Sequence, residues 1–185
     1  MFTRETLAES IRAYRTSFPE EAPFIREFLE LLKHKRSFYR DHLPGHITGS
    51  AWIIDPSGEK ALLTHHAKLN RWLQPGGHAD GDENIISVAL REATEETGLR
   101  SLRLLRREIF DLDIHAIPER NDFPAHLHFD VRILLEADPA ENVTVTGESH
   151  DLAWVAFHQL AAKTGGNLSM ARMAAKVTSL RPDQQ

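Results

Sequence analysis

The segment from residue 82 to residue 97 constrains this chain most, because it predicts a helix with two different flanks. On a wheel of about 100° per residue, the apolar flank contains Ile86, Ala89, Leu90 and Ala93. The adjoining flank contains three carboxylates, Glu92, Glu95 and Glu96. The apolar flank suits packing against a sheet, which leaves the carboxylates together along one side of the packed helix.

This acidic flank indicates a metal site, with an ordinary solvated face as the alternative. Like charges three and four residues apart destabilise an isolated helix by roughly a few tenths of a kcal/mol per pair. Mg²⁺ or Mn²⁺, which prefer oxygen ligands, make such a cluster favourable. Gly76 and Gly77, which follow Pro75 and lead into the helix, favour the metal interpretation because they let the backbone approach a ligand closely.

The ends of the helices carry their own signals. Asp80 with Glu83 predicts a capping box before the acidic helix, and Gly98 predicts a left-handed cap after it. Thr6 with Glu9 predicts another capping box near the start of the chain.

The remaining chain predicts interleaved strands and helices without regular βαβ units. Residues 6–43 predict mostly helix, including one over residues 20–34. Strands are predicted over residues 46–54, 60–66, 104–115, 126–136 and 151–157, a loop over 71–77 and a closing helix over 169–180. We therefore expect an α/β (α+β) fold, with an N-terminal helical extension over residues 1–45 and one domain over residues 46–185.

Composition excludes several classes of protein. The chain has no cysteine, which removes disulfide frameworks, thiolate nucleophiles and cysteine-based zinc sites. It shows no signal peptide and no membrane span, so we expect a cytoplasmic protein without a membrane partner. The net charge of −5, with acids and bases interspersed, gives no general attraction for a polyanion, so a nucleic-acid polymer is not the expected partner.

The stretch from Gly77 to Leu99 matches a family signature. The signature is Gly, five residues, Glu, seven residues, Arg-Glu, an apolar residue, any residue, Glu-Glu, any residue, Gly and an apolar residue. Its nine specified places are filled by Gly77, Glu83, Arg91, Glu92, Ala93, Glu95, Glu96, Gly98 and Leu99. The chain therefore resembles the Nudix hydrolases, as a MutT-like member of bacterial type, over roughly residues 47–160.

This resemblance implies a fold, a reaction and a cofactor. The fold is the Nudix α/β/α sandwich with a central mixed sheet. The reaction is hydrolysis of the diphosphate bond in a nucleoside diphosphate linked to another group. Mg²⁺ or Mn²⁺ is the implied cofactor, and by position its ligands are Glu92, Glu95 and Glu96.

Catalysis in such a site requires a base that accepts a proton from the attacking water. Relatives differ in the residue that does this: Glu96 is preferred here, and Glu148 is the alternative, with an exposed loop acid as its ordinary interpretation. Glu95 and Arg91 belong to the implied catalytic set as well. The supporting residues of the signature are Gly77, Glu83 and Gly98.

Weaker candidates for substrate binding are Trp72, Gly76, His78, Arg120, His126 and His128. For Trp72, stacking on a base competes with core packing, and for Arg120, phosphate binding competes with a solvated side chain. His126 and His128 point to one face of a predicted strand, in a chain with eleven histidines. A histidine-lined phosphate pocket or plain surface histidines are preferred for them, and a second, histidine-based metal site is the alternative.

Three functions from different classes fit parts of this pattern. A pyrophosphohydrolase leads, acting on a nucleotide sugar, ADP-ribose, a dinucleoside polyphosphate or a nucleoside triphosphate. A nucleotide sensor without turnover is the alternative, although such domains are expected to lose some of the glutamates. An enzyme like isopentenyl diphosphate isomerase is disfavoured, because that chemistry uses a cysteine. A homodimer, joined through the N-terminal helices, is a further expectation.

Overall fold

The computed structural model describes residues 3–120 and 123–180, and the chain divides into two compact units. The first unit consists of Met1–Ser50, Gly76–Glu92 and Arg106–Ile133, and the second of Ala51–Pro75, Ala93–Leu105 and Leu134–Gln185. The boundary between them falls within three elements, β1 (Gly45–Ile54), α3 (Ile85–Thr97) and β7 (His126–Glu136). The predicted boundary at residue 45 separates a helical extension from one domain, so it is not the boundary between these two units, and it stays a prediction.

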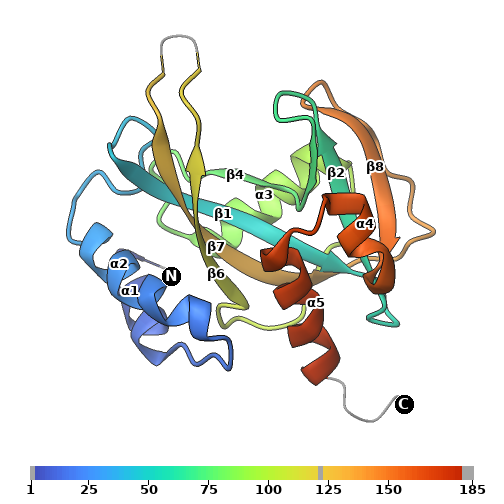
Figure 1. Ribbon diagram of the computed structural model, residues 1–185, viewed down its shortest axis with the longest axis horizontal. Coiled ribbons are helices and arrows are strands. Elements are labelled where there is room, and N and C mark those ends of the chain that lie inside the picture. The colour runs from blue at the N-terminus through green and yellow to red at the C-terminus, as the bar shows by residue number, and fades with distance from the viewer. Residues whose placement is uncertain (1–2, 121–122, 181–185) are drawn as a thin grey trace. The chain divides into compact units, whose positions relative to one another are not determined.

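Helices open the first unit (Figure 1). They are α1 (Arg4–Ala13), a 3-10 turn η1 (Pro19–Glu21) and α2 (Ala22–Leu31). The capping box of α1 is formed by Thr3 and Thr6, each side chain accepting from the backbone N–H of the other. The predicted box of Thr6 with Glu9 is therefore wrong, because the helix begins earlier and Thr3 satisfies its first free N–H groups.

Four strands of the first unit form a mixed sheet. β4 (Gly76–His78) pairs antiparallel with β1, β6 (Asp111–Ile117) pairs antiparallel with β7, and β1 neighbours β7. The Leu127 N–H donates to the Pro44 carbonyl at 2.8 Å, and the Thr48 hydroxyl donates to Asp130 at 3.1 Å. The register thus advances in the same direction along both strands, so β1 and β7 run parallel. The predicted α+β class with a mixed sheet is confirmed.

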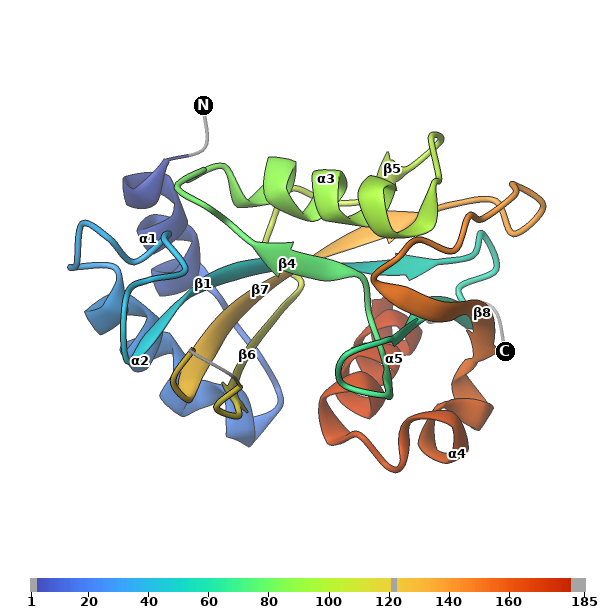
Figure 2. The ribbon, with the colours of Figure 1, turned by 90° about the horizontal axis from the view of Figure 1, so that it is seen from above.

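The helix α3 lies along one face of these strands (Figure 2). A side chain at Gly49 of β1 would meet Ile85 and Val88 of α3. On the same face, Phe129 of β7 packs edge-on against Phe28 of α2, with ring centroids 5.3 Å apart. Because side chains alternate along a strand, the opposite face carries a polar set. Its members on β1 and β7 are His46, Thr48, Ser50, His126, His128, Asp130 and Arg132.

A buried charge network occupies part of this polar face. The Arg132 side chain is 3% exposed and donates to Asp130, Asp111 and Asp113 at 2.9, 3.0 and 3.0 Å. Asp130 also accepts from the Ser50 hydroxyl at 2.7 Å. Three carboxylates close together in the interior are tolerated because the guanidinium lies among them, and the same charges raise the pKa of Arg132 against the opposing effect of burial.

The second unit is built around β2 (Lys60–His66), which pairs antiparallel with the end of β1 and with two further strands. These further strands are β3 (Arg71–Leu73) and β8 (Ser149–Ala156). Separately, β5 (Arg103–Leu104) pairs with the end of β7. A 3-10 turn η2 (Phe157–Gln159) leads into α4 (Leu160–Thr164), which contacts β3, β8 and the closing helix α5 (Leu168–Leu180).

Two of the predicted elements need correction. The predicted loop over residues 71–77 contains β3 and the start of β4. Each has only three residues, yet β3 pairs with β2 and β4 pairs with β1. The predicted strand over residues 104–115 is interrupted, with β5 ending at Leu104 and β6 beginning at Asp111. The charged residues 106–108 lie in this gap, where they reach solvent. Within the described ranges, no helix is long and apolar enough to cross a membrane.

Replacement of Arg132 by leucine is expected to destabilise the protein by about 3–5 kcal/mol, because it leaves buried carboxylates without a counter-charge. The matched control is Arg103→Leu, which removes an exposed ion pair with Glu136 and is expected to cost less than about 1 kcal/mol. Urea denaturation followed by circular dichroism measures both values. Equal, small losses in the two variants would show that the buried network contributes little.

Candidate active site

The acidic helix α3 begins at Ile85 and is capped by Asn84, not by the predicted box of Asp80 with Glu83. The Asn84 side-chain oxygen accepts from Ser87 N at 3.4 Å. Asp80 instead has a left-handed backbone, φ +49°, and pairs with Arg40. That hydrogen bond from Arg40 holds the pKa of Asp80 below its usual value.

The other end of α3 follows the prediction. Gly98 has φ +75°, and its N–H donates to the Thr94 carbonyl at 2.9 Å. A left-handed residue at this position ends the helix and suits glycine, which has no Cβ to strain. The adjacent Leu99 is fully buried, so the chain turns into the interior directly after the acidic helix.

Glu83, the first glutamate of the signature, is held by Arg4 of α1. It accepts from the Arg4 backbone N at 2.9 Å, Nε at 3.2 Å and Nη2 at 2.9 Å. Arg4 also donates to the carbonyls of His34 and Lys35, at 2.9 and 2.8 Å. Sequence reasoning missed this contact because the partners are 79 residues apart. One signal was present: an arginine in the first turn of a helix opposes the helix dipole and calls for a carboxylate nearby.

Glu92 lies directly against β4. A side chain at Gly77 would overlap the Glu92 carboxylate, so the strand and the helix approach this closely only with glycine there. Arg91 donates to Glu92 at 2.6 Å and to the His78 carbonyl at 2.9 Å. The Glu92 side chain is 12% exposed. Arg91 and Gly77 together thus fix the carboxylate of Glu92.

Glu95 and Glu96 follow Glu92 on α3 and belong, with Glu148, to the second unit. Glu95 is exposed and Glu96 is buried at 7% exposure. Glu148 is exposed in the loop before β8, where its carbonyl accepts from Ala67 N at 2.9 Å. Carboxylates three and four residues apart on one helix are a donor set suited to Mg²⁺ or Mn²⁺, which take oxygen ligands.

The weaker substrate candidates fall in different places. Trp72, on β3 in the second unit, stacks on His65 with ring centroids 4.9 Å apart, and Lys163 Nζ lies 3.8 Å from its ring centroid. Gly76, on β4, lies against Ser50 with no room for a side chain. Arg120 is exposed after β6, and its backbone pairs with Phe123. Trp72 thus belongs to the second unit, whereas Gly76 and Arg120 belong to the first.

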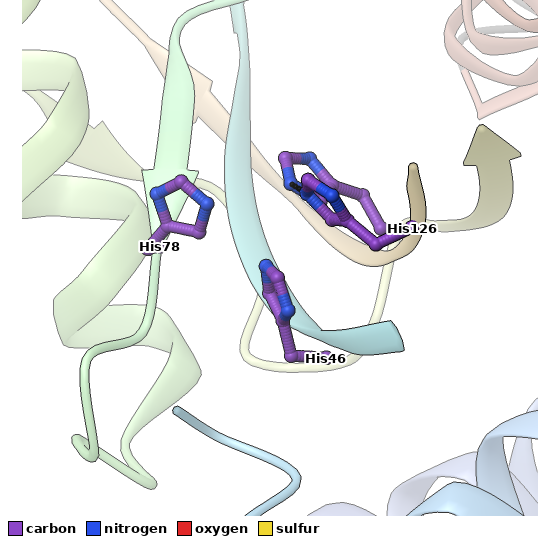
Figure 3. A group of neighbouring side chains, drawn as sticks. His46, His78 and His126 are labelled. Carbon is purple, nitrogen blue, oxygen red and sulfur yellow. Dashed lines mark hydrogen bonds between the residues drawn. The ribbon is translucent and has the colours of Figure 1, made fainter. Parts of the chain in front are cut away.

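The histidine candidates converge within the first unit (Figure 3). His78, His126 and His128 are joined by His46, and one ring nitrogen from each lies within 4.8 Å of the others. These four residues are called the histidine cluster below. Its ring centroids are 5.0–5.1 Å apart in the neighbouring pairs. His46 was not predicted, because only the two-residue spacing of His126 and His128 is visible locally.

The environment of His46 and His128 disfavours their protonation. Burial, followed by the charge of His78, lowers the pKa of His46 to about 4. Burial, followed by the charge of His115, lowers the pKa of His128 to about 2. These two imidazoles are therefore neutral at neutral pH, with a nitrogen lone pair available on each ring.

The family model of the NUDIX domain matches residues 44–177, which is well over half of the chain. The chain belongs to the Nudix family. The signature of residues 77–99, which resembles the Nudix box and is called so below, lies within the matched range.

Individual Nudix proteins share about a quarter to a third of the aligned residues with the chain. The m7GpppN-mRNA hydrolase NUDT17 of Danio rerio is 30% identical in an alignment of length 114 that covers 50% of this chain and 38% of that protein. The probable DHNTP pyrophosphohydrolase of Lactococcus lactis is 26% identical over 139 residues, covering 74% of this chain and 81% of that protein. The chain thus spans well under half of the first relative.

Solved structures confirm the Nudix fold. The MutT protein from Methanosarcina mazei matches with a TM-score of 0.55 at 20% identity, covering 77% of this chain and 97% of that one. At this identity the likeness concerns the fold and not the substrate. The predicted family and fold are both confirmed.

Gly77→Ala is expected to destabilise the protein by about 1–3 kcal/mol and to weaken Mn²⁺ binding, because the added methyl group displaces the Glu92 carboxylate. Gly147→Ala is the matched control, since a side chain at Gly147 would meet nothing within 4 Å. Thermal unfolding and Mn²⁺ titration by electron paramagnetic resonance measure the two effects. Wild-type Mn²⁺ affinity in Gly77→Ala would contradict the proposed part of Glu92 in the metal site.

Proposed function

We propose that this Nudix protein hydrolyses the diphosphate bond of a nucleotide derivative with Mg²⁺ or Mn²⁺. The observation that carries the proposal is the complete Nudix box, in which Gly77 and Arg91 fix Glu92 against β4. The relatives support it by their names, an m7GpppN-mRNA hydrolase and a probable DHNTP pyrophosphohydrolase. Those two names specify different substrates. The box is therefore stronger evidence for the type of bond that is cut than for the group attached to that bond.

The proposed roles follow from the chemistry of the side chains. Glu92, Glu95 and Glu96 would hold the divalent ions, and these ions would neutralise charge on the diphosphate and acidify a water molecule. Arg91 orients Glu92 through its 2.6 Å hydrogen bond. Glu83 and Arg4 hold the start of the helix in place, so that the three carboxylates keep their direction. Glu96 is the proposed base, and Glu148 is the alternative.

The substrate is proposed to be a small diphosphate compound, bound by a cytoplasmic protein that forms a homodimer. Nothing in the composition attracts a polyanion, since the net charge is −5. The name of the Danio rerio relative makes a capped mRNA end the main counter-candidate. A panel of substrates therefore has to contain small diphosphate compounds, namely nucleotide sugars and dinucleoside polyphosphates, as well as a short capped RNA.

Turnover of one substrate class with Mg²⁺ or Mn²⁺ is expected, and Glu96→Gln is expected to lower its kcat/KM by at least about 100-fold. Glu27→Gln makes the same change of charge at an exposed position on α2 and should leave turnover unchanged. Chromatography of the products gives the rates and shows which phosphorus is attacked. Full turnover in a Glu95→Gln, Glu96→Gln double variant would remove the box from the mechanism. A folded wild type that binds the panel but cleaves none of it would favour the nucleotide sensor.

The two candidate bases are separated by Glu148→Gln. If Glu96 is the base, this variant is expected to keep Mn²⁺ affinity and to lose less than about tenfold in kcat, well below the effect of removing a general base. The measurement is the pH dependence of kcat, in which the loss of a base removes the acidic limb of the profile. Disappearance of that limb in Glu148→Gln, with metal binding intact, would transfer the role to Glu148.

A further inference from the structure

The histidine cluster brings together four imidazoles to which the proposed hydrolytic mechanism assigns no role. His46 comes from β1, His78 from β4, and His126 and His128 from β7, all within the first unit. Figure 3 shows the rings of His46, His78 and His126 directed toward one another from three separate strands.

Hydrogen bonds orient two of these rings. His126 Nδ1 lies 2.9 Å from the Pro124 carbonyl, and His46 Nδ1 lies 3.4 Å from the His42 carbonyl. A carbonyl only accepts, so each Nδ1 carries the proton and each Nε2 of a neutral ring keeps its lone pair. This arrangement, with one ring nitrogen bonded to a carbonyl and a lone pair on the other, is characteristic of histidine ligands to metals. The Nε2 of His126 lies 3.2 Å from His128 Nε2.

His46 supplies the second observation. Its ring is fully buried, and across the described residues its Nε2 has no hydrogen-bond partner. A buried acceptor without a donor costs about 1–3 kcal/mol in desolvation when nothing binds it. A cation at the centre of the cluster would use this lone pair.

The spacing suits a tetrahedral ion. Zn–N bonds of about 2.0–2.1 Å place the ligand nitrogens of a tetrahedron roughly 3.3–3.4 Å apart. His126 Nε2 and His128 Nε2 are 3.2 Å apart, and all four ligand nitrogens lie within 4.8 Å of one another.

We propose that His46, His78, His126 and His128 form a binding site for a transition-metal ion, Zn²⁺ by preference, separate from the carboxylate site of the Nudix box. Four nitrogen ligands without a carboxylate suit Zn²⁺ and not Mg²⁺ or Ca²⁺, which require oxygen. A phosphate pocket fits less well, because an anion requires hydrogen-bond donors, whereas the buried Nε2 of His46 is an acceptor. With four protein ligands the site is closed, as structural zinc sites are.

The effect of the ion is to position β4. The side chain of His78 binds the ion, while its carbonyl accepts from Arg91 at 2.9 Å, and the preceding Gly77 lies against Glu92. His115 flanks the cluster, with its ring centroid 5.5 Å from that of His128, and its Nδ1 is 3.2 Å from Asp113. Zinc thus joins β1, β4 and β7 at their histidine-bearing ends and holds the strand on which the Nudix box packs.

The test uses the full-length chain without a histidine tag, stripped with a chelator and then titrated with Zn²⁺ in excess Mg²⁺. One Zn²⁺ per chain is expected to remain after gel filtration, measured by elemental analysis. Substitution with Co²⁺ should give the intense visible absorption of a four-coordinate nitrogen site. Loss of Zn²⁺ to excess Mg²⁺, or the weak spectrum of six-coordinate Co²⁺, would overturn the proposal.

Variants assign the signal to the cluster. His126→Asn and His128→Gln are expected to weaken Zn²⁺ binding by at least about 100-fold. His158→Asn removes an exposed histidine from the second unit and should change nothing. Glu92→Gln and Glu96→Gln should keep the Co²⁺ spectrum even where they abolish hydrolysis, so the two sites are distinguishable. Circular dichroism without metal checks that each variant is folded, and a Co²⁺ spectrum unchanged in folded His126→Asn and His128→Gln would refute the assignment.

Discussion

The close approach of β4 to α3 is the contact on which the functional parts of this structure depend. It requires glycine at position 77, because any side chain there would overlap the Glu92 carboxylate. Arg91 closes the contact by bridging Glu92 and the His78 carbonyl. Since consecutive residues of a strand point to opposite faces, the strand that supports Glu92 through Gly77 directs His78 the other way. One short strand therefore serves the carboxylates of the Nudix box on one side and the histidine cluster on the other.

The polar face of β1 and β7 shows how the interior treats buried charge and buried neutral groups. Arg132 is almost completely enclosed, yet its guanidinium has a carboxylate at each of three nitrogens. Asp130 in turn accepts from Ser50 and Thr48, so this network is internally satisfied. His46 lies two residues before Thr48 on the same face of β1. It differs from the network because its Nε2 is buried and has no hydrogen-bond partner in the described chain. This contrast between a satisfied network and a buried lone pair without a donor is one of the observations behind the proposed metal site.

The sequence predicts what is encoded within a short span. The Nudix box occupies 23 consecutive residues, so its helix, its left-handed cap and its carboxylate spacing are all visible as local periodicity. The ion pair of Arg4 with Glu83 and the arrival of His46 beside His126 are not visible, because both depend on contacts between residues about 80 positions apart. The break between β5 and β6 was missed for a related reason. Apolar residues flank it on both sides, and only pairing within the sheet decides where each strand stops.

The carboxylates of the Nudix box offer oxygen ligands and the histidine cluster offers nitrogen ligands. This difference decides which metal ion each of the two proposed sites binds. For a given set of ligands, Zn²⁺ binds more tightly than Mn²⁺, so carboxylates alone do not exclude zinc from the Nudix box. An imidazole set gains far more from Zn²⁺ than from Mg²⁺, which dehydrates reluctantly and prefers oxygen. With the proposed cluster filled first, scarce zinc is held by nitrogen while abundant magnesium is left to the carboxylates. His78 links the two outcomes, because its side chain belongs to one site and its carbonyl, through Arg91, to the other.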